Sequence, residues 1–292
     1  MFFLTPGSGS RMHMVLQSIL SRKNAMIPGI FLLFLLFSSI LIPYVSPYAE
    51  DIRGAVHFEA GNQAPSLQHW FGTDAAGRDI FTLTIRAGLS SLKVALGVVI
   101  LAVLLGMPLG LLAGTIGRWV DEIIMRITDG FLAFPPLILP LTITAVLGPS
   151  LNNVIIGIAV SWFPWYVRIA RSQALVIRSM DYVLLSKSMG SGNIHVMKKH
   201  ILPNSLSPII VQASIDAGYA ILISAGLSFI GLGAQPPEAE WGLLITQSRA
   251  QFLNHWWVVT FPGLFIVGTV LSFNMIGDEL RNVLNPKLAD QS

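Results

Sequence analysis

Long runs without charged side chains alternate with short polar segments along this chain. At 1.5 Å per residue, about 20 apolar helical residues cross a hydrocarbon core of about 30 Å. Several of the runs reach this length, and the pattern therefore predicts membrane-spanning helices. The predicted spans lie within residues 26–45, 93–118, 130–167, 207–232 and 255–277.

The run from 130 to 167 is too long for one span. Its 38 residues would form a helix of about 57 Å. Gly148-Pro149-Ser150 interrupts it with residues typical of turns. We therefore expect a helical hairpin here, with the segment Arg118 to Arg126 before it forming a short charged turn.

These patterns predict an all-α polytopic membrane protein with six transmembrane helices and a polar loop between spans four and five. Four segments follow from this assignment. They are an N-terminal segment (1–25), a first span with an external loop (26–88), a helical transmembrane domain (89–280) containing the loop 181–204, and a C-terminal tail (281–292).

Composition and charge distribution agree with this class and set an orientation. The chain is 53% hydrophobic and 11% charged, whereas soluble domains carry roughly 25% charged residues. With the N-terminus inside, the predicted inner segments hold thirteen Lys and Arg residues and the outer segments hold four. Positive charge is enriched on the cytoplasmic side, so both termini and residues 181–204 are expected there.

Residues 181–204, DYVLLSKSMGSGNIHVMKKHILPN, form a polar, basic segment between two apolar runs. Gly190-Ser191-Gly192 divides it into two halves. In the second half, Ile194, Met197 and Ile201 have the spacing of one helical face, and Leu202-Pro203-Asn204 is expected to end the helix. An amphipathic helix of this kind suits docking to a soluble partner, and equally suits lying on the lipid surface.

Other polar positions are candidates for a transport route or for packing. Asp216 lies inside the fifth span, where a carboxylate must face a polar interior; it belongs either to a transport path or to a helix–helix hydrogen bond. Asp129 and Phe134 lie near the start of the third span and are further candidates for the same path. Gly106, Gly110 and Gly114 form a doubled GxxxG, which predicts close approach of another helix.

The outer loops carry a second group of candidates. Gly72-Thr73-Asp74 and Gly77-Arg78-Asp79 resemble paired turns in which aspartate side chains cap backbone N–H groups. A structural role fits these residues best. We also consider Asp74, Arg78, Asp79 and Trp241 as contacts for an external protein.

Chemical motifs for catalysis are absent from the sequence. It has no GxxxxGK[ST] nucleotide-binding loop, no HExxH metal motif, no nucleophile elbow and no cysteine. The pI of about 9.3 is too mild to indicate nucleic acid binding. We expect no catalytic residue, no metal site and no cofactor in this chain, which leaves transporter subunit, channel or membrane scaffold as classes.

Six motifs in order resemble the permeases of binding-protein-dependent ABC transporters, specifically the second permease of the peptide/nickel branch. The resemblance covers roughly residues 70–287 and is carried by GTDAAGRD (72–79), MRITDGFLAFP (125–135), LSFIGLGAQPP (227–237), EWG (240–242), FPG (261–263) and FNMIGDELRNVLNP (273–286). The loop 181–204 resembles the segment of these permeases that contacts the ATPases. The family's Glu-Ala-Ala is replaced here by Leu184-Leu185-Ser186.

The resemblance implies an inner-membrane importer that works by alternating access. It implies a homologous permease partner, two ATPase subunits that bind ATP and Mg²⁺, an external substrate-binding protein and contact with membrane lipid, but no nucleic acid. The residues expected to couple to the ATPases are Lys187, Gly190, Ile194, Met197, Lys198, His200, Leu202, Pro203 and Asn204. Di- and oligopeptides are the expected substrates.

Three alternatives remain open at this level. The same machinery handles nickel or a metal chelate in part of this branch. An ion-coupled carrier working alone would need several ionisable residues within the spans. The predicted spans contain Asp216, and Asp129 lies near a span boundary. A non-transporting scaffold would leave the basic inner segment unexplained.

Overall fold

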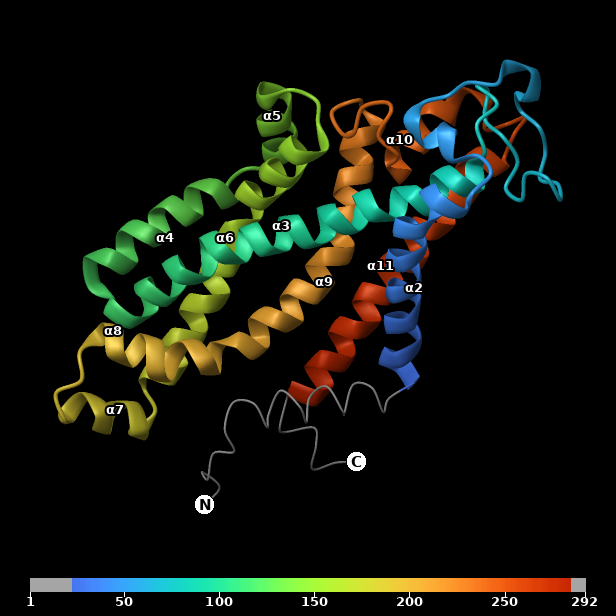
Figure 1. The fold of residues 1–292 in the computed structure, drawn as a ribbon. Helices are drawn as coiled ribbons and strands as arrows, with labels where there is room; N and C mark the ends of the chain where they lie inside the picture. Colours follow the sequence, from blue (N-terminus) through green and yellow to red (C-terminus); the bar gives the residue numbers. More distant parts are fainter. Residues whose placement is uncertain (1–22, 285–292) are drawn as a thin grey trace.

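The computed structural model describes residues 23–284 and is helical throughout the spans (Figure 1). The expected N-terminal segment and the end of the tail lie largely outside the described residues. The elements in chain order are α2 (Lys23–Val45), η1 (Ala49–Arg53), η2 (Phe58–Ala60), α3 (Ile80–Ile116), α4 (Arg118–Leu132), α5 (Ile138–Leu147), α6 (Leu151–Arg178), α7 (Asp181–Ser188), α8 (Asn193–Val196), η3 (Met197–Ile201, a π-helical turn), α9 (Leu202–Phe229), α10 (Trp241–Ser248), η4 (Arg249–Gln251) and α11 (Trp257–Leu284).

Five helical stretches in the described part are long and apolar enough to cross a membrane, and α5 is a shorter apolar helix. The predicted third span is therefore broken. Its apolar half is α5, and the segment 118–126 that we expected to be a charged turn is the first part of α4 instead. Because α4 is amphipathic, its charges lie on one face and do not interrupt the helix. The predicted all-α multi-span fold is confirmed, and the five spans together with α5 are compatible with the predicted six-span architecture.

The second span is longer than its charge-free run indicated. Helix α3 begins at Ile80, so the predicted segment boundary between 88 and 89 falls inside it. Asp79 caps this start, because its side chain accepts from the backbone N–H of Thr82 at 2.8 Å. The Arg86 guanidinium is accommodated within the helix by donating to the carbonyl of Ser39 on α2 at 3.1 Å.

The predicted glycine interface is confirmed, and its partner is α6. A Cβ at Gly106 would lie 2.3 Å from the carbonyl oxygen of Phe163, and one at Gly110 would lie 2.3 Å from that of Val167. At Gly114 the Cβ would lie 2.6 Å from that of Ala174. The three glycines therefore bring the backbones of α3 and α6 into direct contact, the arrangement by which small residues hold helices together in lipid.

The predicted hairpin turn between α5 and α6 is also confirmed. Gly148 has φ +92°, a conformation that favours glycine. Ser150 caps α6 by accepting from the backbone N–H of Asn153 at 3.1 Å, and the Asn153 amide donates to the carbonyls of Leu147 and Gly148. The chain therefore reverses within three residues and lays α5 against α6.

The core surrounds α3, α6 and α9, and a second cluster joins α2, α3, α10 and α11. Figure 1 shows α7 and α8 at one end of the molecule, far from α10 and the loops that follow α2. The two ends therefore carry different polar segments, as the alternation of apolar and polar runs predicted.

Candidate functional sites

The polar segment 181–204 forms two short helices that meet at a glycine. Gly190 has φ +91° and ends α7, while Ser191 and Ser186 join the two halves through their hydroxyls at 2.9 Å. The backbone N–H of Ser191 also donates to the carbonyl of Ser186 at 3.1 Å. The predicted division into two halves is therefore confirmed.

The buried face of the second half differs from the prediction. Val196 and Ile201 are fully buried and Met197 is partly buried, but Ile194 is 63% exposed. The residues from Met197 to Ile201 form a π-helical turn, which adds one residue to a helical turn and changes the angular position of everything before it. The prediction that Ile194 shares one helical face with Met197 and Ile201 was therefore wrong, because it assumed 3.6 residues per turn throughout.

Leu202-Pro203-Asn204 does not end the helix, contrary to the prediction. The chain from Asn193 to Phe229 is one continuous helical stretch, in which Pro203 lies within the first turn of α9. Because Pro203 has no backbone N–H, the helical hydrogen bond that this group would donate is missing. The Asn204 side-chain amide donates to the carbonyl of His200 at 2.6 Å and Ser205 Oγ donates to that of Ile201 at 2.8 Å, which satisfies carbonyls across the junction. This end of the loop and the fifth span therefore form one helical body.

The outward face of the loop is both apolar and basic. Four large apolar side chains on α7, α8 and the residues between them are exposed, namely Leu184, Leu185, Met189 and Ile194. Of the residues assigned to ATPase coupling, Gly190, Lys198, Pro203 and Asn204 are exposed, and Lys187, Met197, His200 and Leu202 are partly buried. Exposed apolar side chains on a polar loop are typical of a surface that contacts another protein or the membrane.

Two ion pairs join α4 to α6. The Arg171 guanidinium contacts the Asp121 carboxylate through Nε and Nη2 at 2.5 and 2.7 Å, and these side chains are 31% and 21% exposed. Arg168 Nη2 donates to Asp129 Oδ1 at 2.7 Å, and this pair is more open, with 46% and 57% exposed. Asp129, a candidate residue of the transport path, thus lies at the α4–α6 contact.

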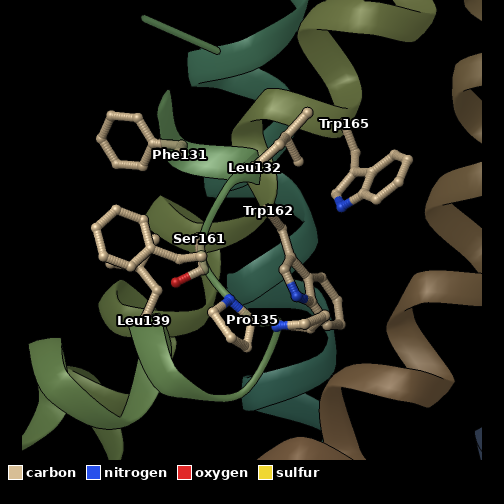
Figure 2. Close-up of a pocket in the computed structure, with 9 residues that line it drawn as sticks. Phe131, Leu132, Pro135, Leu139, Ser161, Trp162 and Trp165 are labelled. Atoms are coloured by element: carbon tan, nitrogen blue, oxygen red, sulfur yellow. The ribbon is translucent and has the colours of Figure 1, made fainter. Parts of the chain in front are cut away.

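An aromatic cleft lies between the α4–α5 connection and α6 (Figure 2). It has a volume of roughly 100 Å³. Its lining comprises Phe131, Leu132, Phe134, Pro135, Pro136, Leu139, Ser161, Trp162 and Trp165. Phe134, the second candidate path residue, therefore lines a cleft. The sequence prediction had grouped it with Asp129 only because the two residues are close in the chain.

Asp216 does not line this cleft; it lies at the contact of α6 and α9. Tyr166 Oη donates to Asp216 Oδ2 at 2.7 Å, and Gln212 Nε2 donates to Oδ1 at 2.8 Å. One turn away, the rings of Trp162 and Tyr219 stack with centroids 5.5 Å apart. Both carboxylate oxygens have donors, and this geometry fits the helix–helix hydrogen bond that was the alternative for Asp216.

The outer turns have the predicted capping geometry. Gly72 and Gly77 have positive φ, and Asp74 Oδ1 accepts from the backbone N–H groups of Ala76 and Arg78, each at 2.9 Å. Asp74, Asp79 and Trp241 are all buried, and Trp241 Nε1 donates to the carbonyl of Thr84 at 2.8 Å. Direct contact of these three side chains with an external protein is therefore excluded in this conformation, while Arg78 bonds to Asp74 and Gln247.

Burial also raises the pKa values of two carboxyl groups in these outer loops. Burial raises the pKa of Asp51, opposed by hydrogen bonds from the backbone N–H of Asp79 at 2.7 Å and from His57 at 3.1 Å. Burial likewise raises the pKa of Glu240, which caps α10 by accepting from the N–H of Leu243 at 2.9 Å. These groups hold the shape of the outer loops.

Sequence reasoning missed Trp162, Trp165, Arg168 and Tyr166. The first charged residue after the long apolar run is Arg168, and it was counted only for orientation. Helical spacing places Trp165 one turn before it and could have indicated a shared face.

The fold and its sites define a multi-span membrane protein with a two-helix loop that exposes apolar and basic side chains. Residues 106–290 match the model of the family described as "Binding-protein-dependent transport system inner membrane component". The chain belongs to this family, the inner-membrane permeases of binding-protein-dependent transport systems, and the resemblance found in the sequence is confirmed.

Named relatives and solved structures agree. The chain is 43% identical over 281 residues to the "Probable D,D-dipeptide transport system permease protein DdpC" of Escherichia coli (strain K12), covering 96% of this chain and 92% of that protein. It is 48% identical over 226 residues to the "Dipeptide transport system permease protein DppC" of Alkalihalophilus pseudofirmus, covering 77% and 74%. The MetNI methionine ABC transporter, in an inward facing conformation, shares the fold at 20% identity with a TM-score of 0.57, covering 69% of this chain and 96% of that one.

Proposed function

We propose that this chain carries di- or oligopeptides across the inner membrane as one of two homologous permease subunits of an ABC importer. The observation that carries the proposal is 43% identity across nearly the whole chain to a permease named for D,D-dipeptide transport. Other relatives are named for dipeptide and glutathione transport, and these names do not support the alternative that nickel is the substrate.

In the proposed assembly, two ATPase subunits bind ATP and Mg²⁺ and dock on residues 181–204 from the cytoplasm. Support comes from the exposed Leu184, Leu185, Met189 and Ile194, which would meet an apolar groove on the ATPase. Leu184 and Leu185 occupy positions where the family has Glu and Ala, so apolar contact would replace an acidic one.

The continuous helix from Asn193 to Phe229 supports a direct mechanical connection between the docking loop and the fifth span. Movement of the ATPases would displace α8 and α9 together, because both belong to one uninterrupted helical stretch. A ligand shifts an equilibrium only through its different affinities for two states, so ATP would act on this chain through the ATPases.

Both termini would be cytoplasmic, and an external binding protein would deliver substrate to residues 46–88 and 233–254. The Lys and Arg distribution supports this orientation. Among the outer residues, exposed side chains such as Phe58, Leu67 and Leu253 are better contacts for the binding protein than the buried Asp74, Asp79 and Trp241.

Reconstitution tests the proposal. The chain is assembled in liposomes with its second permease, the ATPases and the binding protein, and uptake of a labelled dipeptide is measured with ATP inside or outside. We expect uptake that requires ATP on the ATPase side and stops when the ATPase nucleotide-binding lysine is replaced. Uptake that persists without the ATPases, or uptake of Ni²⁺ in place of the dipeptide, would contradict the proposal.

A further inference from the structure

The ion pair of Arg168 and Asp129 is more open than a structural pair requires. A single hydrogen bond, from Nη2 to Oδ1, joins the two side chains, and about half of each is exposed. The neighbouring Arg171–Asp121 pair is bidentate and less exposed, so it can fasten α4 to α6 by itself. A guanidinium has five N–H donors, so Arg168 retains donors that can bind a further carboxylate.

Two residues of the aromatic cleft lie one helical turn from the members of this pair. Leu132 lies one turn after Asp129 on α4, and Trp165 lies one turn before Arg168 on α6, so both cleft residues are on the faces that carry the pair. Figure 2 shows Leu132 and Trp165 at the same end of the cleft. The indole of Trp165 and the ring of Phe134 are each more than half exposed. The ion pair and the apolar cleft are therefore about one helical turn apart on both α4 and α6.

This face must meet water or protein. Arg168 follows 17 charge-free residues of α6, which span about 26 Å from the start of the helix. In a hydrocarbon core of about 30 Å, this distance places the pair close to the far boundary, where its exposed side can reach water.

We propose that Arg168 and the adjacent aromatic cleft form a contact site for peptides in transit. Arg168 binds the C-terminal carboxylate, and the apolar part of the peptide lies against Trp162, Trp165 and Phe134. Asp129 acts as a positioning residue, because its carboxylate holds the guanidinium about one helical turn from the cleft. This inference rests on the proposed function and deepens it by naming the group of the substrate that is recognised.

Photolabelling tests the site directly. The assembled complex, without its binding protein, is exposed to alanyl-photoleucine as the free acid and as the C-terminal amide, and labelled residues are mapped by mass spectrometry. We expect labels within 131–139 and 161–165, and about tenfold stronger labelling by the acid, because a charge-assisted hydrogen bond is lost in the amide. Omitting the binding protein removes its own preference from the measurement.

Variants separate recognition from folding. Arg168→Gln is expected to abolish the preference for the acid, and Arg168→Lys, which keeps the charge but loses the planar fork, to reduce it. Arg126→Gln is the matched control, because Arg126 pairs with Glu122 on the exposed surface of α4 and is expected to leave the preference unchanged. Trp165→Phe is expected to weaken labelling by both peptides while the preference remains.

The inference is overturned if wild-type labelling is equal for acid and amide, if the labels map to other segments, or if Arg168→Lys and Arg168→Gln keep the full preference. Dipeptide uptake by the complete wild-type importer is measured in parallel. Its failure would contradict the proposed function, whereas normal uptake with an unaltered acid preference in the variants would contradict this site alone.

Discussion

The hydroxyl of Tyr166 donates a hydrogen bond of 2.7 Å to Asp216 Oδ2 and thereby joins α6 to α9 within the membrane-spanning part of the chain. Tyr166 is completely buried, and Gln212 supplies the second carboxylate oxygen with a donor. A buried acceptor that loses its donor costs free energy, so this contact stabilises the packing of the two helices.

Replacing Tyr166 with Phe is expected to destabilise the subunit by about 1–3 kcal/mol, because one oxygen of Asp216 then lacks its donor. The measurement is thermal unfolding of the purified subunit in detergent. Tyr219→Phe is the control, since its ring stack on Trp162 is retained. Asp216→Asn is expected to lower stability less than Tyr166→Phe and to leave uptake measurable; abolished uptake at unchanged stability would assign Asp216 to the transport path instead.

Replacing Gly110 with Ala is expected to disrupt the α3–α6 interface. The new Cβ would lie 2.3 Å from the carbonyl oxygen of Val167, which is backbone and cannot move aside alone. We expect a loss of about 1–3 kcal/mol or more, measured by thermal unfolding and by yield of folded subunit. Gly226→Ala in α9 is the control, because nothing lies within 4 Å of its Cβ position. Equal stability of both variants would contradict the assigned interface.

The sequence predicted those features that depend on local chemistry. The glycine spacing predicted a tight interface, and the aspartate positions predicted the turns at 72–79, because a cap involves groups only a few residues apart. The sequence did not reveal that α6 is the partner of the glycines, since any helix can approach a glycine stripe.

The wrong predictions came from local sequence rules that neighbouring residues in the fold overrode. Pro203 was expected to end a helix, but hydrogen bonds from Asn204 and Ser205 carry the chain across that point. The π-helical turn at 197–201 changed the face of Ile194, and no residue pattern marked it. The pairing of Arg168 with Asp129 depends on how α4 lies against α6, so sequence spacing could not predict it.

Asp51 is expected to make the outer loops more stable in acid. Because burial raises its pKa, the protonated form is favoured by folding; its contribution is fully present below the ordinary aspartate pKa and is lost as the pH rises through the raised value. Asp51→Asn resembles the protonated form and removes this dependence. Thermal unfolding between about pH 4 and pH 7 is therefore expected to show wild type losing stability relative to the variant as the pH rises. Parallel curves, or a relative gain by wild type, would contradict this assignment.

Gly190 and Gly192 provide a matched pair for testing the docking loop. Nothing lies within 4 Å of a Cβ at either position, but Gly190 has φ +91° and Gly192 has φ −69°. Alanine at 190 is therefore expected to cost about 1–2 kcal/mol of backbone strain, whereas alanine at 192 fits the existing backbone. We expect Gly190→Ala to weaken co-purification of the ATPases and to increase hydrogen exchange across residues 181–201, with Gly192→Ala close to wild type. If both variants retain the ATPases equally, the angle between α7 and α8 does not determine docking, and the exposed leucines of α7 would have to provide it without the second helix.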